Sequence, residues 1–284
     1  MIQFVAQRIL IACLRLLIAS LIMLVGIELA FRLAGGAIDH AWTIAPELFS
    51  GAFLNDLFFA RLIGSSLVFG LGFLLVLFVG YGWGLVAARL RWLQARLWLS
   101  APLALLSCFP IFWVLVMVAA YAYWIWDRPG FANEIAIEEG PDWLGWWHAA
   151  VQGLCVGAGP AVWQLGAVSA IIGKSAAQPF VGGLFRAGFR ESFVFYRHFV
   201  RGSISQLCGL LDRTVPCLIG GLIVAETAFR YDGLGSWLVA SALGGDYLGM
   251  FVAGWCLTLP VVAIRCFREC LERFWDSAGD RSDA

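Results

Sequence analysis

Residues 62–88 read LIGSSLVFGLGFLLVLFVGYGWGLVAA and contain no Asp, Glu, Lys or Arg. Residues 101–126 and 149–173 are equally free of charge. Each of these runs exceeds the roughly 20 apolar residues that cross the hydrocarbon core of a bilayer. They do not show the alternating segments of about 10 residues that build a membrane barrel. Because backbone polar groups in lipid must then be paired within each helix, the sequence predicts an all-α polytopic membrane protein.

The composition supports the same fold class. Hydrophobic residues make up 61% of the chain, charged residues 13%, and Lys174 is the single lysine. Further apolar runs at 9–31, 204–229 and 248–264 are interrupted or edged by charge. A cleaved signal peptide is the alternative for 9–31, but the run is longer than a usual signal core. We therefore expect one transmembrane domain over 1–284, with six spans at 9–31, 62–88, 101–126, 149–173, 204–229 and 248–264.

Basic residues orient these spans. Arginines gather between the second and third spans, and five basic residues lie between the fourth and fifth: Lys174, Arg186, Arg190, Arg197 and Arg201. Cytoplasmic loops carry such an excess, so we expect both loops and both termini to be cytoplasmic. The outer loop 127–148 mixes carboxylates with tryptophans. It is either an ordinary solvated loop or a docking surface for a protein that delivers substrate.

Nothing in the sequence indicates catalysis or a metal. Six of the eight cysteines lie within apolar runs, where cysteine packs as a small hydrophobe. Gly173, Lys174 and Ser175 imitate the end of a phosphate-binding loop, but Val168 occupies the position of the required first glycine. We expect no metal site, no cofactor in this chain and no nucleic-acid partner. An ATP-driven role would need a partner ATPase.

The run 204–229 carries two carboxylates at membrane depth. Asp212, Ile219 and Glu226 recur every seven residues, so the first and last differ by about 40° around a helix and share one face. Ionisable groups in a membrane usually face a bundle interior or a wet cavity. We expect these three residues to line a translocation path. A structural salt bridge for Asp212, and simple solvation of Glu226 near the outer end, stay open as alternatives.

A series of short motifs from Phe180 onward resembles the permease subunits of dipeptide, oligopeptide and nickel ABC importers. Its members are Gly188, Arg197-His198, Gly220-Gly221, Glu226-Thr227, Gly233-Leu234-Gly235 and Asp246-Tyr247. The resemblance implies a six-helix permease of the bacterial cytoplasmic membrane that moves a peptide-like solute or metal chelate by alternating access. It implies a second permease, two cytoplasmic ATPases that hold ATP and Mg, and an extracytoplasmic binding protein.

Two other functions compete with the importer. One is a diverged paralogue with a structural or sensory role. The other is an intramembrane enzyme, which would need paired aspartates or a Ser and a His within the spans. Asp212 is the only aspartate deep in a long apolar run, which argues against the enzyme.

By the same resemblance, segment 180–199 contains a short coupling helix that seats on the ATPase. We expect this helix over 180–189, with Phe180 and Phe185 as apolar contacts, Arg186 and Arg190 at the rim, and Gly188 allowing close backbone approach. The competing interpretation is an amphipathic helix in the inner leaflet, because Phe and Arg also suit the headgroup region.

Overall fold

The computed structural model describes residues 11, 14–16, 18, 56–89, 117 and 142–280. Most of the expected spans 9–31 and 101–126, and most of the outer loop 127–148, lie outside the described residues. Within the described part the chain is built of helices and turns without strands, and the all-α prediction is confirmed.

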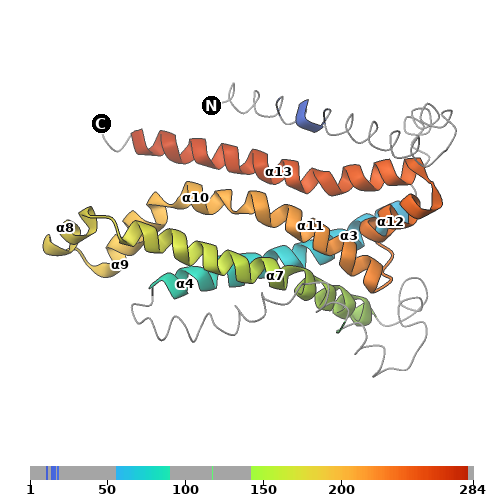
Figure 1. The fold of residues 1–284 in the computed structure, drawn as a ribbon, viewed down its shortest axis with the longest axis horizontal. Helices are drawn as coiled ribbons and strands as arrows, with labels where there is room; N and C mark the ends of the chain where they lie inside the picture. Colours follow the sequence, from blue (N-terminus) through green and yellow to red (C-terminus); the bar gives the residue numbers. More distant parts are fainter. Residues whose placement is uncertain are drawn as a thin grey trace. The chain divides into compact units, whose positions relative to one another are not determined.

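Among the described residues, four helical stretches are long and apolar enough to cross a membrane: Asp56–Arg89, Ala149–Ala176, Ile204–Ala228 and Tyr247–Leu271. They cover the expected runs 62–88, 149–173, 204–229 and 248–264, apart from Phe229. The first comprises α3 (Asp56–Leu75), the π-helix η2 (Val76–Trp83) and α4 (Gly84–Arg89). The others belong to α7 (Asp142–Ala176), to α10 (Ile204–Gly209) with α11 (Leu211–Ala228), and to α13 (Tyr247–Asp280) (Figure 1).

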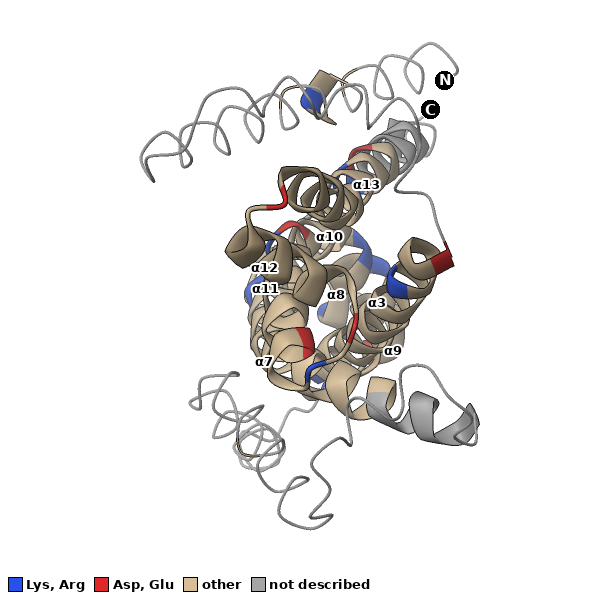
Figure 2. Cartoon of the chain, turned by 90° about the vertical axis from the view of Figure 1, so that its right-hand side faces the viewer, with Lys and Arg blue, Asp and Glu red and all other residues tan. Residues whose placement is uncertain are grey.

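Shorter helices connect these stretches. Three follow α7, namely α8 (Phe180–Arg186), α9 (Glu191–Val194) and the π-helix η3 (Phe195–Val200). Between α11 and α13 lies α12 (Leu234–Gly244). Charged residues are sparse along the described helices, as the colouring of the cartoon in Figure 2 shows.

The chain divides into two compact units. One, which we call the outer-loop unit, comprises residues 1–67, 128–145 and 222–284; the other, the α8 unit, comprises 68–127 and 146–221. Our expectation of a single permease domain stays a prediction. In the outer-loop unit α12 packs against α13 (Figure 1).

Glycines set the helix packing of the α8 unit. A Cβ added at Gly157 of α7 would lie 2.6 Å from the carbonyl oxygen of Gly72, so the two backbones are in direct contact. Further along, a Cβ at Gly80 would lie 2.8 Å from Cβ of Gln164. Small residues allow such close approach of membrane helices. Gly72, Gly80 and Gly157 therefore allow α7 to pack closely against α3 and η2.

Candidate coupling and translocation sites

The turn after α8 explains Gly188. The amide of Phe189 donates to the Leu184 carbonyl at 3.2 Å and the amide of Gly188 donates to the Phe185 carbonyl at 3.1 Å. This is the Schellman pattern, which places a left-handed residue just after the helix. Gly188 has φ +82°, and nothing lies within 4 Å of a Cβ built on it. Glycine is thus favoured here by the left-handed backbone conformation. Close packing against other described parts of the chain does not require it.

The helix is also shorter than expected. We predicted helix over 180–189, but α8 ends at Arg186, because the left-handed residue at 188 turns the backbone away from the helix axis. Phe189 and Arg190 therefore lie beyond the helix, and Arg190 is extended as the residue preceding α9.

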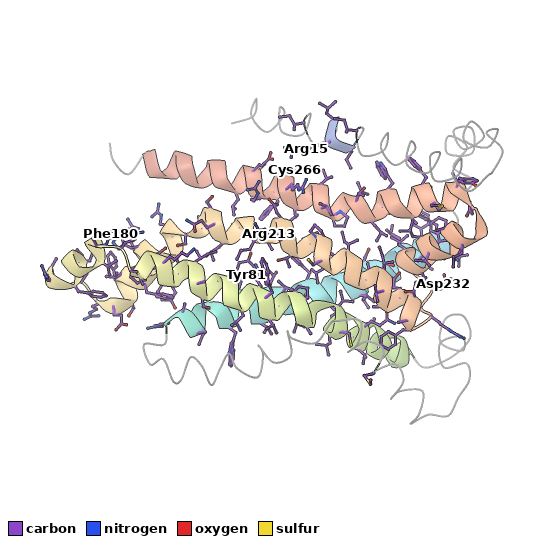
Figure 3. The ribbon with its side chains drawn as sticks, viewed as in Figure 1. Arg15, Tyr81, Phe180, Arg213, Asp232 and Cys266 are labelled. Carbon is purple, nitrogen blue, oxygen red and sulfur yellow. The ribbon has the colours of Figure 1, made fainter. Side chains whose placement is uncertain are left out.

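Four phenylalanines around this turn are exposed. Phe180, Phe185, Phe189 and Phe193 keep 54%, 40%, 46% and 46% of their surface open, and we call them the aromatic patch. Phe189 stacks on Phe193 at 5.5 Å, and the His198 ring lies edge-on to Phe180 at 6.4 Å and to Phe193 at 6.1 Å. Figure 3 shows Phe180 on α8.

Charge borders this patch. Arg186, Arg190 and Arg197 are exposed, whereas His198 is half-buried between the two phenylalanines that it contacts. Exposed apolar groups of this size usually mark an interaction surface or a membrane contact. Phe180 and Phe185 were predicted from the sequence, whereas Phe189 and Phe193 were not. Phe193 lies near Phe180 through the His198 ring that both contact.

A buried core lies beneath α8. Val181 and Leu184 of α8 pack with side chains from α7, α9, η3 and α10: Val168, Ile172, Val194, Phe195, Phe199 and Leu207. Val181 is 6% exposed and Val194 is fully buried. The short helix is therefore held on its inner face while its aromatic patch stays open.

The predicted path residues on α11, Asp212, Ile219 and Glu226, lie in two different environments. Asp212 and Ile219 are half-buried, and Gly220 and Pro216 beside them are exposed. Glu226, by contrast, is fully buried. The alternative that Glu226 is solvated is therefore wrong. Whether Asp212, Ile219 and Glu226 line a translocation path stays a prediction.

Glu226 is bound by the first residues of α12. Its Oε2 accepts from the amides of Gly235 at 2.6 Å and Ser236 at 3.2 Å, and its Oε1 accepts from Ser65 Oγ at 2.5 Å. Ser65 Oγ in turn accepts from the Leu234 amide at 2.7 Å. The first amides of a helix lack intrahelical partners and favour negative charge. Glu226 and Ser65 thus cap α12, and we call this arrangement the Glu226 cap.

The same contacts explain two motif glycines. A Cβ at Gly233 would overlap the Glu226 carboxyl group, and one at Gly235 would lie 2.9 Å from Glu226 Oε2 and 2.7 Å from the Ile223 Cα. Glycine at both positions leaves room for the carboxyl group. Their spacing from Glu226 was readable in the sequence, but the contact was not.

Charged and aromatic groups surround the Glu226 cap. Arg61 Nε lies 2.8 Å from Asp232 Oδ1, and its guanidinium lies 5.2 Å from the Trp237 ring centroid. Figure 3 shows Asp232 in the loop between α11 and α12. Burial, with the nearby carboxylates of Glu226 and Asp232, raises the pKa of the Tyr231 phenol above its ordinary value, so the phenol stays neutral.

Comparison with known proteins identifies the family of this chain. Residues 80–276, from η2 into α13, match the family described as binding-protein-dependent transport system inner membrane component. The chain belongs to this family. It is accordingly a multi-pass inner-membrane protein and a component of a transport system.

A curated relative shares part of the sequence. The oligopeptide transport system permease protein AppB of Bacillus subtilis (strain 168) is 35% identical over 60 residues. This match covers 21% of the chain and 19% of that relative.

The family match includes both sites but not every residue in them. It contains the aromatic patch, Gly188 and Glu226, whereas Arg61 and Ser65 precede its first residue. Ser65 could not be predicted as a site residue from the sequence, because nothing distinguishes it from the other serines in the apolar runs. It is found only through its hydrogen bonds to Glu226 and Leu234.

Three further motif residues have local structural contacts. Asp246 Oδ1 accepts from the Gly249 amide at 3.0 Å at the start of α13, and Asp246 Oδ2 accepts from Ser241 Oγ at 3.2 Å. Thr227 Oγ1 donates within α11, to the Ile223 carbonyl at 2.8 Å. Gly221 packs on Val156 in the α8 unit. Of these three residues, Asp246 caps a helix, at the start of α13.

Proposed function

We propose that this chain is the permease subunit of an ATP-driven importer, and that the aromatic patch on α8 and α9 receives the movement of a partner ATPase. The observation that carries the proposal is an apolar surface that no described part of the chain covers, on a helix whose other face is buried. Interfaces commonly centre on such aromatic anchors with arginines at the rim. Membership of the transport family supports the same function.

The proposed complex contains a second permease, two ATPases that hold ATP and Mg, and an extracytoplasmic binding protein. The solute is small, peptide-like or a metal chelate, and moves by alternating access. The name of the partial relative, an oligopeptide permease, supports the peptide-like class. The diverged structural or sensory paralogue is the competing function, and it predicts that no ATPase binds the aromatic patch.

Replacing Phe185 by alanine tests the coupling surface. Loss of a central aromatic anchor should weaken ATPase binding by about 2 kcal/mol, or roughly 30-fold. Phe267→Ala is the matched control, because Phe267 is also an exposed phenylalanine, 56% open, on α13. The ATPase that co-purifies with the chain is titrated against each variant in detergent.

Three outcomes separate the functions. Weaker ATPase binding in Phe185→Ala alone supports coupling. Equal binding in both variants contradicts it. If Phe185→Ala instead lowers binding of the isolated permease to anionic vesicles and leaves ATPase binding intact, the helix is an inner-leaflet anchor.

Orientation follows from the proposal. With both termini cytoplasmic, α8 and α9 lie inside and α12 lies outside. Single cysteines at Ser192 and at the 86% exposed Leu243, in a background without the eight native cysteines, should be labelled from opposite sides of the membrane. Labelling from the same side would contradict this topology.

Asp212 is proposed to line the path. Asp212→Asn keeps the side-chain shape and removes the charge, so uptake should fall while the complex stays assembled. Loss of assembly would instead assign Asp212 a structural role, and unchanged uptake with unchanged assembly would exclude both roles.

A further inference from the structure

The stretch Ile204–Ala228, the third of the four candidate spans, is not one regular helix. It is interrupted at Leu210, between α10 and α11. The Leu210 amide donates to the Leu207 carbonyl at 3.2 Å, three residues back, where a regular α-helix would connect residues four apart. Gly209, directly before Leu210, is a poor helix former, whereas the nearest proline, Pro216, lies six residues on.

A side chain from another helix binds a carbonyl at this interruption. The Tyr81 phenol of η2 donates to the Leu207 carbonyl at 2.7 Å. Thr214 Oγ1 lies 3.0 Å from the Leu210 carbonyl oxygen and 2.7 Å from Oε1 of the fully buried Gln164 of α7. Within the stretch, the Leu207 carbonyl also accepts from the Leu210 amide, and the Leu210 carbonyl accepts from the amides of Arg213 and Thr214. The Tyr81 phenol is therefore an additional partner, from another helix, at the carbonyl where the hydrogen-bond pattern changes.

The same interruption is packed against α8. Leu207 is 6% exposed and belongs to the buried core that contains Val181 and Leu184 of α8, and the Tyr81 side chain packs on that core. Cores at native density do not absorb displacements by compression. A shift of α8 must therefore move Leu207 and Tyr81 or repack the side chains between them.

The position of Tyr81 adds a further constraint. It lies in a π-helix, a form that is rare and frequently occurs at functional positions. Gly80, directly before it, receives the stem of Gln164, which fixes η2 against α7. Tyr81, which binds the Leu207 carbonyl, and Gln164, which contacts Thr214, are thus joined at one contact between η2 and α7.

We propose that residues 207–210 form a hinge that carries movement of α8 into α11, and that the Tyr81 phenol is the positioning group that sets this hinge. The inference rests on the proposed function, since it takes α8 as the element that the ATPase moves. Movement of α8 breaks or restores the Tyr81–Leu207 bond and thereby changes the direction in which α11 leaves the hinge.

Tyr81→Phe tests the proposal, because it keeps the ring in the core and removes only the hydroxyl. In proteoliposomes with the co-purifying ATPase and binding protein, solute uptake per ATP hydrolysed should fall on the order of fivefold, the change that one net hydrogen bond gives an equilibrium. ATPase binding should be unchanged. Tyr196→Phe is the matched control: Tyr196 is 57% exposed, and its ring, which faces Arg89, is kept.

A second pair of variants protects the test against misfolding. Thr214→Val keeps the side-chain shape without the hydroxyl, whereas Thr214→Ser keeps the hydroxyl. We expect Val to lower uptake per ATP and Ser to retain it. In Tyr81→Phe and Thr214→Val, amide hydrogen exchange over 207–214 should also rise and lose its response to nucleotide.

Unchanged uptake per ATP in Tyr81→Phe overturns the hinge, as does equal behaviour of Thr214→Val and Thr214→Ser. A chain that binds no ATPase even as wild type contradicts the proposed function instead. In that case the exchange measurement without nucleotide still decides whether Tyr81 and Thr214 control the interruption, and unchanged exchange in their variants overturns it.

Discussion

Two short helices, α8 and α12, end alike and begin differently. Each ends at a left-handed glycine, Gly188 with φ +82° and Gly245 with φ +72°. The first amides of α12 are bound by Glu226 and Ser65, whereas Pro179 before α8 provides no side-chain cap. At α12 the motif residues satisfy the chain's own backbone. Among the described residues around α8, the exposed phenylalanines bind no helix-end amide, and Phe180, Phe189 and Phe193 make ring contacts among themselves and with His198. The difference separates residues that hold the fold from residues available to a partner.

The largest expected effect is at the Glu226 cap. Glu226→Ala leaves the Gly235 and Ser236 amides and the Ser65 hydroxyl buried without their acceptor, which should lower the free energy of unfolding by roughly 3 kcal/mol. Thermal unfolding of the purified protein in detergent measures this. Thr227→Val is the neighbouring control, because the Thr227 hydroxyl bonds only within its own helix. If the two variants are equally stable, the Glu226 cap does not stabilise α12, and the distinction between α12 and α8 is wrong.

A smaller effect is expected at Gly188. Gly188→Ala places a side chain at φ +82° and should cost about 1–2 kcal/mol in the turn, seen as faster hydrogen exchange over 184–190. Gly188→Asn should cost less, because asparagine tolerates the left-handed conformation. If alanine and asparagine are equally tolerated, conformation is not the reason for this glycine, and close contact with a partner becomes the better explanation.

The smallest effect is expected at the Arg61–Asp232 pair. Asp232 is 41% exposed on its side chain, and exposed ion pairs contribute about 0–1 kcal/mol. Asp232→Asn should therefore shift the unfolding midpoint much less than Glu226→Ala, with the shift decreasing further at high salt. A loss as large as that of Glu226→Ala would show that the ion pair belongs to the cap.

Four of the expected spans could be placed from the sequence because hydrophobic length is a local property. The position of α8 could also be predicted, because the motifs around it keep their spacing without gaps. Its end at Arg186 could not be predicted, because it depends on the φ of Gly188, and the sequence allows that angle without requiring it. The patch could not be predicted either, because Phe193 joins Phe180 through the His198 ring that both contact.

The sequence by itself determined the fold class and the place of the motif, because apolar runs too long for soluble helices allow few other folds. Only the tertiary structure decided what Glu226 does. Its seven-residue spacing from Asp212 suggested a shared path, yet its carboxyl group is bound by α12 and by Ser65, which is 161 residues away. A hydrogen bond depends on which backbone donors the fold leaves without partners, and helical periodicity carries no information about them.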